Sequence, residues 1–116
     1  MTMRTQQGTS NDFAGLEVLI VGLAREGTAV ARFLASHGAC VTVTDIKPAE
    51  ELDESIAALS GLSIAFALGG HPMALLEGMD IVYASPGVPL ETALLVEARR
   101  RNIPLSSETR LFATRC

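Results

Sequence analysis

Aromatic residues are scarce in this sequence, which contains no Trp, one Tyr and four Phe. Hydrophobic residues still make up 48% of its 116 positions, so the core has to be built from aliphatic side chains. Such a core is typical of a parallel sheet that is covered by helices on both faces. A chain of this length is large enough to form one domain with a core of its own.

Long apolar runs, paired cysteines and blocks of like charge are missing as well. Nowhere do eighteen apolar residues run together, and the polar first twelve residues lack the apolar region of a signal peptide. Cys40 and Cys116 do not have the spacing of a metal site, which favours a reducing compartment. The net charge of −4 is spread along the chain and indicates no surface for nucleic acid or anionic membranes. We therefore expect a cytoplasmic protein without nucleic-acid or membrane partners.

The stretch from Glu17 to Asp45 has the clearest pattern. A short apolar run at 18–21 leads to a glycine turn, an amphipathic helical segment at 25–37 and a β-branched run that ends at Asp45. Gly38 follows the helical segment, as glycine commonly does where a helix ends in the left-handed conformation. Strand, turn, helix and strand in this order predict the first βαβ unit of a doubly wound sheet.

The rest of the chain continues to alternate between strands and helices. This alternation predicts an α/β fold, namely a Rossmann-like, doubly wound parallel sheet of about five strands with helices on both faces. Further strands are expected at 62–68, 80–84 and 103–106. Further helices are expected after Pro48 and over 92–101, and a short helix is expected after Pro72 that ends at Gly78.

The glycine turn carries a motif with a chemical meaning. Gly22, Ala24 and Gly27 occupy the three small-residue positions of a dinucleotide-type fingerprint. Gly22 permits a sharp turn, Gly27 permits close packing of the helix, and the amides at the helix start favour a phosphate or pyrophosphate. Asp45 lies 23 residues after Gly22, where such units place an acid that binds a ribose or base. The pattern predicts a site for a nucleotide-like ligand, and the alternative is a structural turn with a solvated Asp45.

A second loop, Ser85–Pro89, follows the fourth predicted strand. Its Pro86 and Gly87 are typical of the two middle positions of a type II turn. Because the strand order of a doubly wound sheet reverses beside the first strand, the first and fourth strands should be neighbours and their loops should face each other. Replacing Gly22 by valine is therefore expected to block the site without unfolding the domain. His71 is interpreted as a loop or cap residue, because it has no nearby partners in the sequence.

No group of residues has the spacing of a catalytic or metal site. The glycine turn continues as Thr28-Ala29 and lacks the Lys-[Ser/Thr] pair of an ATP phosphate loop. We therefore expect a domain that binds a ligand and, alone, catalyses no reaction.

Together these segments resemble the N-terminal domain of the Mur ligases. The similarity lies in VLIVGLAREGTAVARFLASHGACVTVTD, GGHP, DIVYASPGVP and IPLSSETRLF, and it extends from Gly15 to Phe112. The resemblance implies that residues 15–106 form a Rossmann-like domain that holds the UDP part of UDP-N-acetylmuramoyl-L-alanine. Residues 1–14 are then a flexible N-terminal segment, and residues 107–116 are the start of a linker to a central ATPase domain that this chain lacks.

The same resemblance assigns the UDP contacts. Glu26 departs from the family, which often has Ser or Thr there, so either its carboxylate points to solvent or Arg25 offsets its charge. The resemblance implies no catalytic or metal-binding residue in this domain. The implied substrate-binding residues are Gly22, Leu23, Ala24, Arg25, Glu26, Gly27, Asp45, Ile46, Lys47, Ser85, Pro86 and Gly87.

The resemblance also implies what the missing domains supply. They bind ATP, magnesium and an amino acid, which the resemblance suggests is D-glutamate, and they form an amide bond through an acyl phosphate. The domain alone is accordingly expected to be inactive, to hold no cofactor and to be a monomer.

Two other functions stay open. An NAD(P)-binding domain of an oxidoreductase uses the same kind of turn, although Ala24, Lys47 and the Pro-Gly loop have no required place in it. A regulatory Rossmann-like domain that binds no nucleotide is the second alternative, and the carboxylate of Glu26 is the feature that supports it.

Overall fold

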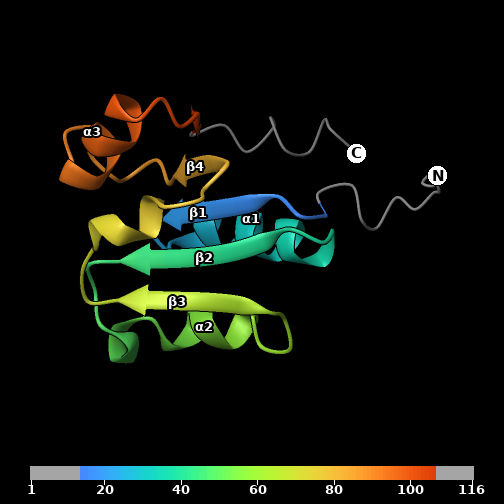
Figure 1. Ribbon diagram of the computed structural model, residues 1–116. Helices are drawn as coiled ribbons and strands as arrows, with labels where there is room; N and C mark the ends of the chain where they lie inside the picture. Colours follow the sequence, from blue (N-terminus) through green and yellow to red (C-terminus); the bar gives the residue numbers. More distant parts are fainter. Residues whose placement is uncertain (1–13, 107–116) are drawn as a thin grey trace, which may run out of the picture.

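Five parallel strands form a sheet in the structure, a computed structural model that describes residues 14–106 (Figure 1). Their order is β3-β2-β1-β4-β5, so the winding of the chain reverses between β1 and β4, as predicted. The expectations for the N-terminal segment and for the linker fall on residues 1–13 and 107–116, outside the described part. The strands are β1 (Glu17–Val21), β2 (Cys40–Asp45), β3 (Ile64–Leu68), β4 (Ile81–Ala84) and β5 (Leu105–Ser106).

Helices cover both faces of this sheet, which confirms the predicted architecture. In Figure 1 helix α1 lies behind β1 and β2, and α2 lies beside β3. Helix α1 packs on one face of the sheet, and α3 packs on the other face against β1 and β4. The helices are α1 (Arg25–Ser36), α2 (Asp53–Ala58) and α3 (Ala93–Arg100), with 3-10 turns η3 (Ala49–Glu51) and η4 (Met73–Leu76).

The central strand β1 connects two hydrophobic cores. Val18 and Ile20 point to the core beneath α1, whereas Leu19 and Val21 point to the core beneath α3. All four side chains are 0% exposed. Because burial of one such side chain contributes about 1.5–3 kcal/mol, this strand anchors the turn that follows it.

Two of the helical connections differ from the prediction. The helix expected after Pro48 is divided into η3 and a six-residue α2. The helix expected after Pro72 is only the 3-10 turn η4. No residue of α2 is fully buried, and the core contacts of this region come from the partly buried Ile56 and from Leu52 and Leu59, which flank the helix. Within the described part of the chain, no helix is long and apolar enough to cross a membrane.

Two predicted helix ends are confirmed, and one predicted turn is wrong. Gly38 after α1 has a φ of 96°, and Asn102 after α3 has a φ of 62°. Gly87, however, does not have the positive φ that a type II turn requires. Its neighbour Val88 donates its N–H to the Ser85 carbonyl at 3.0 Å and packs its side chain against the core beneath α3. Those tertiary contacts select a turn that the Pro-Gly pair alone does not specify.

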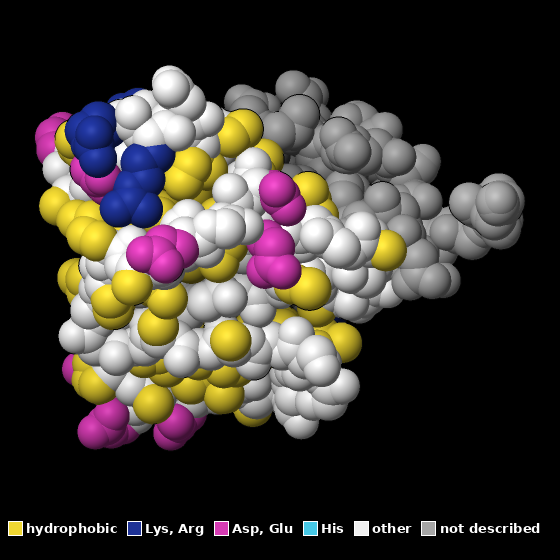
Figure 2. Space-filling view, in the orientation of Figure 1, with side chains coloured by type: hydrophobic (Ala, Val, Ile, Leu, Met, Phe, Trp, Pro, Cys, Tyr) yellow, Lys and Arg dark blue, Asp and Glu magenta, His cyan; other side chains and the backbone are white. Residues whose placement is uncertain are grey.

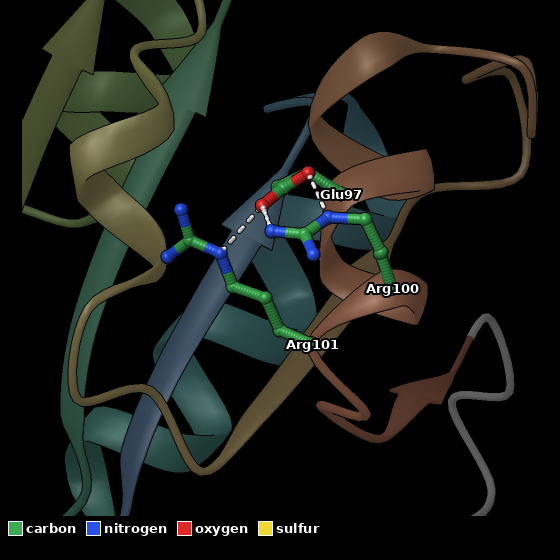
Figure 3. A network of polar contacts seen from close by, with 3 residues as sticks. All are labelled: Glu97, Arg100 and Arg101. Carbon is green, nitrogen blue, oxygen red and sulfur yellow. Dashed lines mark hydrogen bonds and ion pairs between the residues drawn. The ribbon is translucent and has the colours of Figure 1, made fainter.

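Charged side chains gather over α3 on the face shown in Figure 2. The Glu97 carboxylate lies between the guanidinium groups of Arg100 and Arg101, with N–O distances of 2.6 and 2.8 Å (Figure 3). Hydrogen bonds from Arg100 and then from Arg101 lower the pKa of Glu97 from 4.5 to about 2. The arginines expected near the end of this helix thus keep one carboxylate ionised.

Candidate functional site

The turn between β1 and α1 depends on two glycines. Gly22 has a φ of 94°, and its N–H donates to the Thr44 carbonyl at 2.8 Å. A Cβ at Gly22 would lie 2.8 Å from Val88 Cγ2. A Cβ at Gly27 would collide with the Gly22 carbonyl oxygen and lie 2.7 Å from Ser85 Oγ. Both glycines are therefore required by close packing, as the fingerprint predicts.

The expectation that valine at Gly22 blocks the site and spares the fold is wrong. Valine is strained at this positive φ, and its Cβ alone meets two side chains of the opposite loop, Val88 at 2.8 Å and Ser85 at 3.2 Å. The substitution would displace the loop after β4 and destabilise the domain, so it cannot separate binding from folding.

The first turn of α1 has backbone N–H groups that no side chain caps. Its N-cap residue is Ala24, with φ −90° and ψ −171°, and no side-chain hydrogen bond caps the helix. Thr28 does not cap the helix start, because it donates both its N–H and its hydroxyl to the Ala24 carbonyl at 2.8 Å. Uncapped N–H groups and the positive end of the helix dipole make this turn suited to an anion. Glu26 lies in the same turn, where its side chain is exposed to solvent.

Asp45 ties this turn to the loop after β2. Its Oδ2 accepts the Leu23 N–H at 2.7 Å, and its Oδ1 accepts the Lys47 N–H at 2.9 Å. The residue is only 9% exposed, so these two backbone bonds fix the carboxylate. Each carboxylate oxygen can still accept one more hydrogen bond from a ligand. Asp45 therefore organises the site as well as lining it.

Ser85 ties the same turn to the loop after β4. Its hydroxyl donates to the Gly22 carbonyl at 2.7 Å, and its N–H donates to the Val21 carbonyl at 3.0 Å. The side chain is 3% exposed. The two loops that the sequence predicts to face each other are thus in direct contact.

A cavity of about 300 Å³ opens where these loops meet, at the carboxyl edge of the sheet. Seven of the residues assigned from the sequence line it, and four further residues complete its wall. The seven are Gly22, Ala24, Asp45, Ile46, Lys47, Ser85 and Gly87, and the four are His71, Val88, Pro89 and Thr92.

Five of the assigned residues do not line the cavity. Leu23 is 1% exposed and packs in the core beneath α1. Gly27 is buried against the Gly22 carbonyl. The side chains of Arg25, Glu26 and Pro86 are exposed. The question raised by Glu26 is thereby answered in favour of a solvent-facing carboxylate.

Among the residues that line the cavity, His71 is the hardest to predict from the sequence. Its Nδ1 lies 2.9 Å from the Thr44 hydroxyl, and burial is the main cause of a lowered pKa. It is a loop residue, as interpreted, but the loop places it in the cavity wall. The Gly69-Gly70 pair before it was the available signal, since such a pair lets a chain fold back on a preceding strand.

A second, more open hollow lies at the other end of β2 and β3. Its volume is about 660 Å³, but its wall contains no charged side chain. Among residues 14–106 there is also no group of three His, Cys, Asp or Glu that could hold a metal ion. The smaller cavity, with Asp45, Lys47 and His71 in its wall, is therefore the candidate ligand site.

A sheet wound in both directions from β1, with a cavity at the point of reversal, defines a Rossmann-like α/β domain with a ligand site at its switch point. The chain belongs to the family described as Mur ligase MurD-like, N-terminal domain, whose model matches residues 16–107.

Several sequences that are similar to this chain share one name. The UDP-N-acetylmuramoylalanine--D-glutamate ligase of Acidobacterium capsulatum is 43% identical over 102 residues. That of Anaeromyxobacter dehalogenans is 45% identical over 102 residues, and each match covers 88% of this chain and 22% of the relative. The chain therefore spans about a fifth of the length of these relatives, at 22%.

Solved structures share the fold. A pseudomurein peptide ligase type C from Methanothermus fervidus matches with a TM-score of 0.58 and 22% identity, over 79% of this chain and 19% of the other. A short-chain dehydrogenase/reductase from Serratia marcescens matches with a TM-score of 0.52 and 21% identity, over 79% and 49%. At these identities the likeness concerns the fold and carries no function.

Proposed function

We propose that this chain is the N-terminal, UDP-binding domain of an ATP-dependent UDP-N-acetylmuramoyl-L-alanine:D-glutamate ligase of peptidoglycan synthesis. The observation that carries the proposal is the cavity itself. In a member of this family, the uncapped start of α1, the carboxylate of Asp45 and the Ser85 loop meet at one opening.

The diphosphate binds at the start of α1 in this proposal. The backbone N–H groups there attract an anion without help from a side chain, and the dipole of the twelve-residue helix adds to that attraction. The exposed side chains of Arg25 and Glu26 stay in solvent, so the contacts of both residues are made by the backbone.

The nucleoside occupies the cavity. A volume of about 300 Å³ is at the lower limit for small-molecule sites, which suits one nucleoside better than a whole nucleotide sugar. Asp45 offers its remaining acceptor sites to ribose or base, Lys47 adds a positive charge, and Ile46, which is 68% exposed, offers an apolar surface at the rim.

The longer protein carries the chemistry. Its further domains bind ATP, magnesium and D-glutamate, phosphorylate the carboxylate of the bound substrate and let the amine of D-glutamate attack the acyl phosphate. This domain keeps the UDP end of the substrate fixed, and its function requires no catalytic group of its own.

Calorimetric titration of the 116-residue chain with UDP, UDP-N-acetylmuramoyl-L-alanine and NADH tests the proposal. We expect both uridine compounds to bind and NADH not to bind. Binding of NADH alone would establish the nicotinamide alternative, and binding of none of the three would favour a regulatory domain.

A variant that fills the cavity should abolish this binding while the domain stays folded. Ala24 lines the cavity, is exposed and has an extended backbone that any side chain can adopt, so Ala24→Phe is suitable. Ala29→Phe is the matched control, because Ala29 is an exposed residue of α1 outside the cavity wall. Circular dichroism verifies the fold of both. Equal UDP affinity in the two variants would contradict the assigned site.

A further inference from the structure

The segment that carries His71 is fixed to the end of β2. The N–H groups of Gly69 and Gly70 both donate to the Asp45 carbonyl, at 2.8 and 3.1 Å, and Asp45 and Gly70 form an isolated antiparallel bridge. These backbone bonds place His71 beside Asp45 in the wall of the cavity. Its position is therefore set by the fold and does not depend on a ligand.

The Thr44 hydroxyl determines which ring nitrogen of His71 carries the proton. Thr44 Oγ1 donates its one hydrogen to the Gly70 carbonyl at 2.8 Å, and the side chain is fully buried. The same oxygen lies 2.9 Å from His71 Nδ1. Since the hydroxyl hydrogen is already used, Nδ1 must donate to the oxygen. The neutral ring then has its lone pair on Nε2, which is an acceptor.

Nε2 is the polar atom of His71 that remains for a ligand. Within residues 14–106, no hydrogen bond to Nε2 is made. The charged groups that line the cavity with the ring are Asp45 at the end of β2 and Lys47 in the loop after it. Burial lowers the pKa of His71, and the charge of Asp45 opposes that change only in part. The ring is accordingly neutral at pH 7, with its acceptor available.

We propose that His71 is a specificity-determining residue of the nucleoside site, whose Nε2 accepts a hydrogen bond from an O–H or N–H donor of the ligand. This inference rests on the proposed function, since it assumes that a uridine nucleotide occupies the cavity. The donors that such a nucleoside offers are the ribose hydroxyls and the imide N–H of the base.

Protonation of His71 removes the acceptor, because both nitrogens of an imidazolium ion are donors. The contribution of this bond to the affinity for UDP should therefore be constant above the pKa of His71 and fall as the pH is lowered through it. Because burial lowers that pKa, the midpoint of the fall lies below 6.5, the ordinary value for histidine. The loss of one neutral hydrogen bond corresponds to about a three- to tenfold weaker affinity.

Calorimetry of the 116-residue chain with UDP at about pH 5 and about pH 8 tests this, because those values lie on either side of imidazole titration. His71→Phe keeps the ring shape without nitrogen and should bind about three- to tenfold more weakly at the higher pH. His71→Gln keeps an acceptor that does not titrate, so it should keep only the pH dependence that comes from the terminal phosphate of UDP, whose second pKa is about 6. His37→Gln is the matched control, because His37 bonds the Phe33 carbonyl outside the cavity and should behave as the unmodified chain.

Ligand analogues identify the donor. UDP lacking the 2′-hydroxyl, UDP lacking the 3′-hydroxyl and UDP methylated at the imide nitrogen are titrated against the unmodified chain and against His71→Phe. One analogue should bind the unmodified chain more weakly than UDP does. That analogue and UDP should bind His71→Phe almost equally well, because the bond is already lost in the variant. Additive losses for all three analogues would overturn the role of His71.

Nitrogen NMR of the unliganded chain supplies a test that does not depend on binding. The sequence has two histidines, so His37→Gln leaves one ring to observe. We expect Nδ1 of neutral His71 to carry the proton, and a proton on Nε2 would overturn the inference. UDP binding that is unaffected by His71→Phe would overturn it while leaving the proposed function intact. No binding of UDP at any pH would overturn both.

Discussion

Ser85 is a single side chain that holds two loops together. Its hydroxyl donates to the Gly22 carbonyl at 2.7 Å while being 3% exposed, so Ser85→Ala removes that bond with almost no change in shape. We expect the free energy of unfolding to fall by about 1 kcal/mol, the net value of a typical intramolecular hydrogen bond. Urea denaturation followed by circular dichroism measures it.

The matched control for Ser85→Ala is Ser63→Ala, since Ser63 is an exposed residue before β3. Its free energy of unfolding should change by less than about 0.5 kcal/mol. If both variants lose the same stability, Ser85 does not connect the loops as described.

Ala24 shows how a residue can favour binding over stability. Its backbone has the extended conformation of an N-cap, but its methyl group cannot accept a hydrogen bond from the helix. Ala24→Ser supplies an acceptor and should stabilise the domain by about 0.5–2 kcal/mol. The serine oxygen then competes with the ligand for the same N–H groups, so the affinity for UDP should fall. Thermal unfolding and calorimetry should change in opposite directions, and a variant that gains both would argue against diphosphate binding at this turn.

At the level of whole elements, α3 carries a carboxylate whose ionisation persists in acid. Hydrogen bonds from Arg100 and Arg101 lower the pKa of Glu97 from 4.5 to about 2. A lowered pKa in the folded state means that the stabilisation is complete above 4.5 and is lost as the pH falls through about 2. The difference in stability between the unmodified chain and Glu97→Gln should shrink over that interval. Carbon NMR of the Glu97 carboxyl gives its pKa directly, and a value near 4.5 would contradict the network.

The elements that the sequence predicts well are those built from local pattern. β1, α1 and β2 follow from the apolar runs and the fingerprint glycines, and the neighbouring positions of β1 and β4 follow from the winding rule. The length of α2 does not follow from the pattern, because the buried contacts of this region lie at Leu52 and Leu59, the two residues that flank the six-residue helix. The sequence therefore predicts the order of elements better than their lengths.

The residues of the site also differ in how well the sequence predicts them. Residues next to the fingerprint could be assigned from the sequence, whereas His71 and Thr92 enter the cavity wall through contacts between distant segments. The bridge between Asp45 and Gly70 and the bond from Thr44 to His71 join positions that no local pattern relates. The turn at Gly87 differs from expectation because Val88 packs against a core that lies outside the loop.

For the molecule as a whole, the cavity joins loops from β1, β2 and β4, which lie on both sides of the reversal in strand order. A ligand that binds only the folded domain stabilises all of these loops together. UDP at one hundred times its dissociation constant should raise the free energy of unfolding by about 2.7 kcal/mol. Differential scanning calorimetry with and without UDP measures the shift, and Ala24→Phe should show none. An equal shift in that variant would place the ligand elsewhere.

The bond between Ser85 and Gly22 has one more consequence, for the entropy of binding. Because this bond holds the two loops together within the fold, little loop ordering is needed when the nucleotide binds, and the ordering cost that weakens many complexes is small. A preorganised receptor of this kind should bind with little change in its own backbone motion, and the carrier, with its flexible diphosphate, should lose most of the conformational freedom.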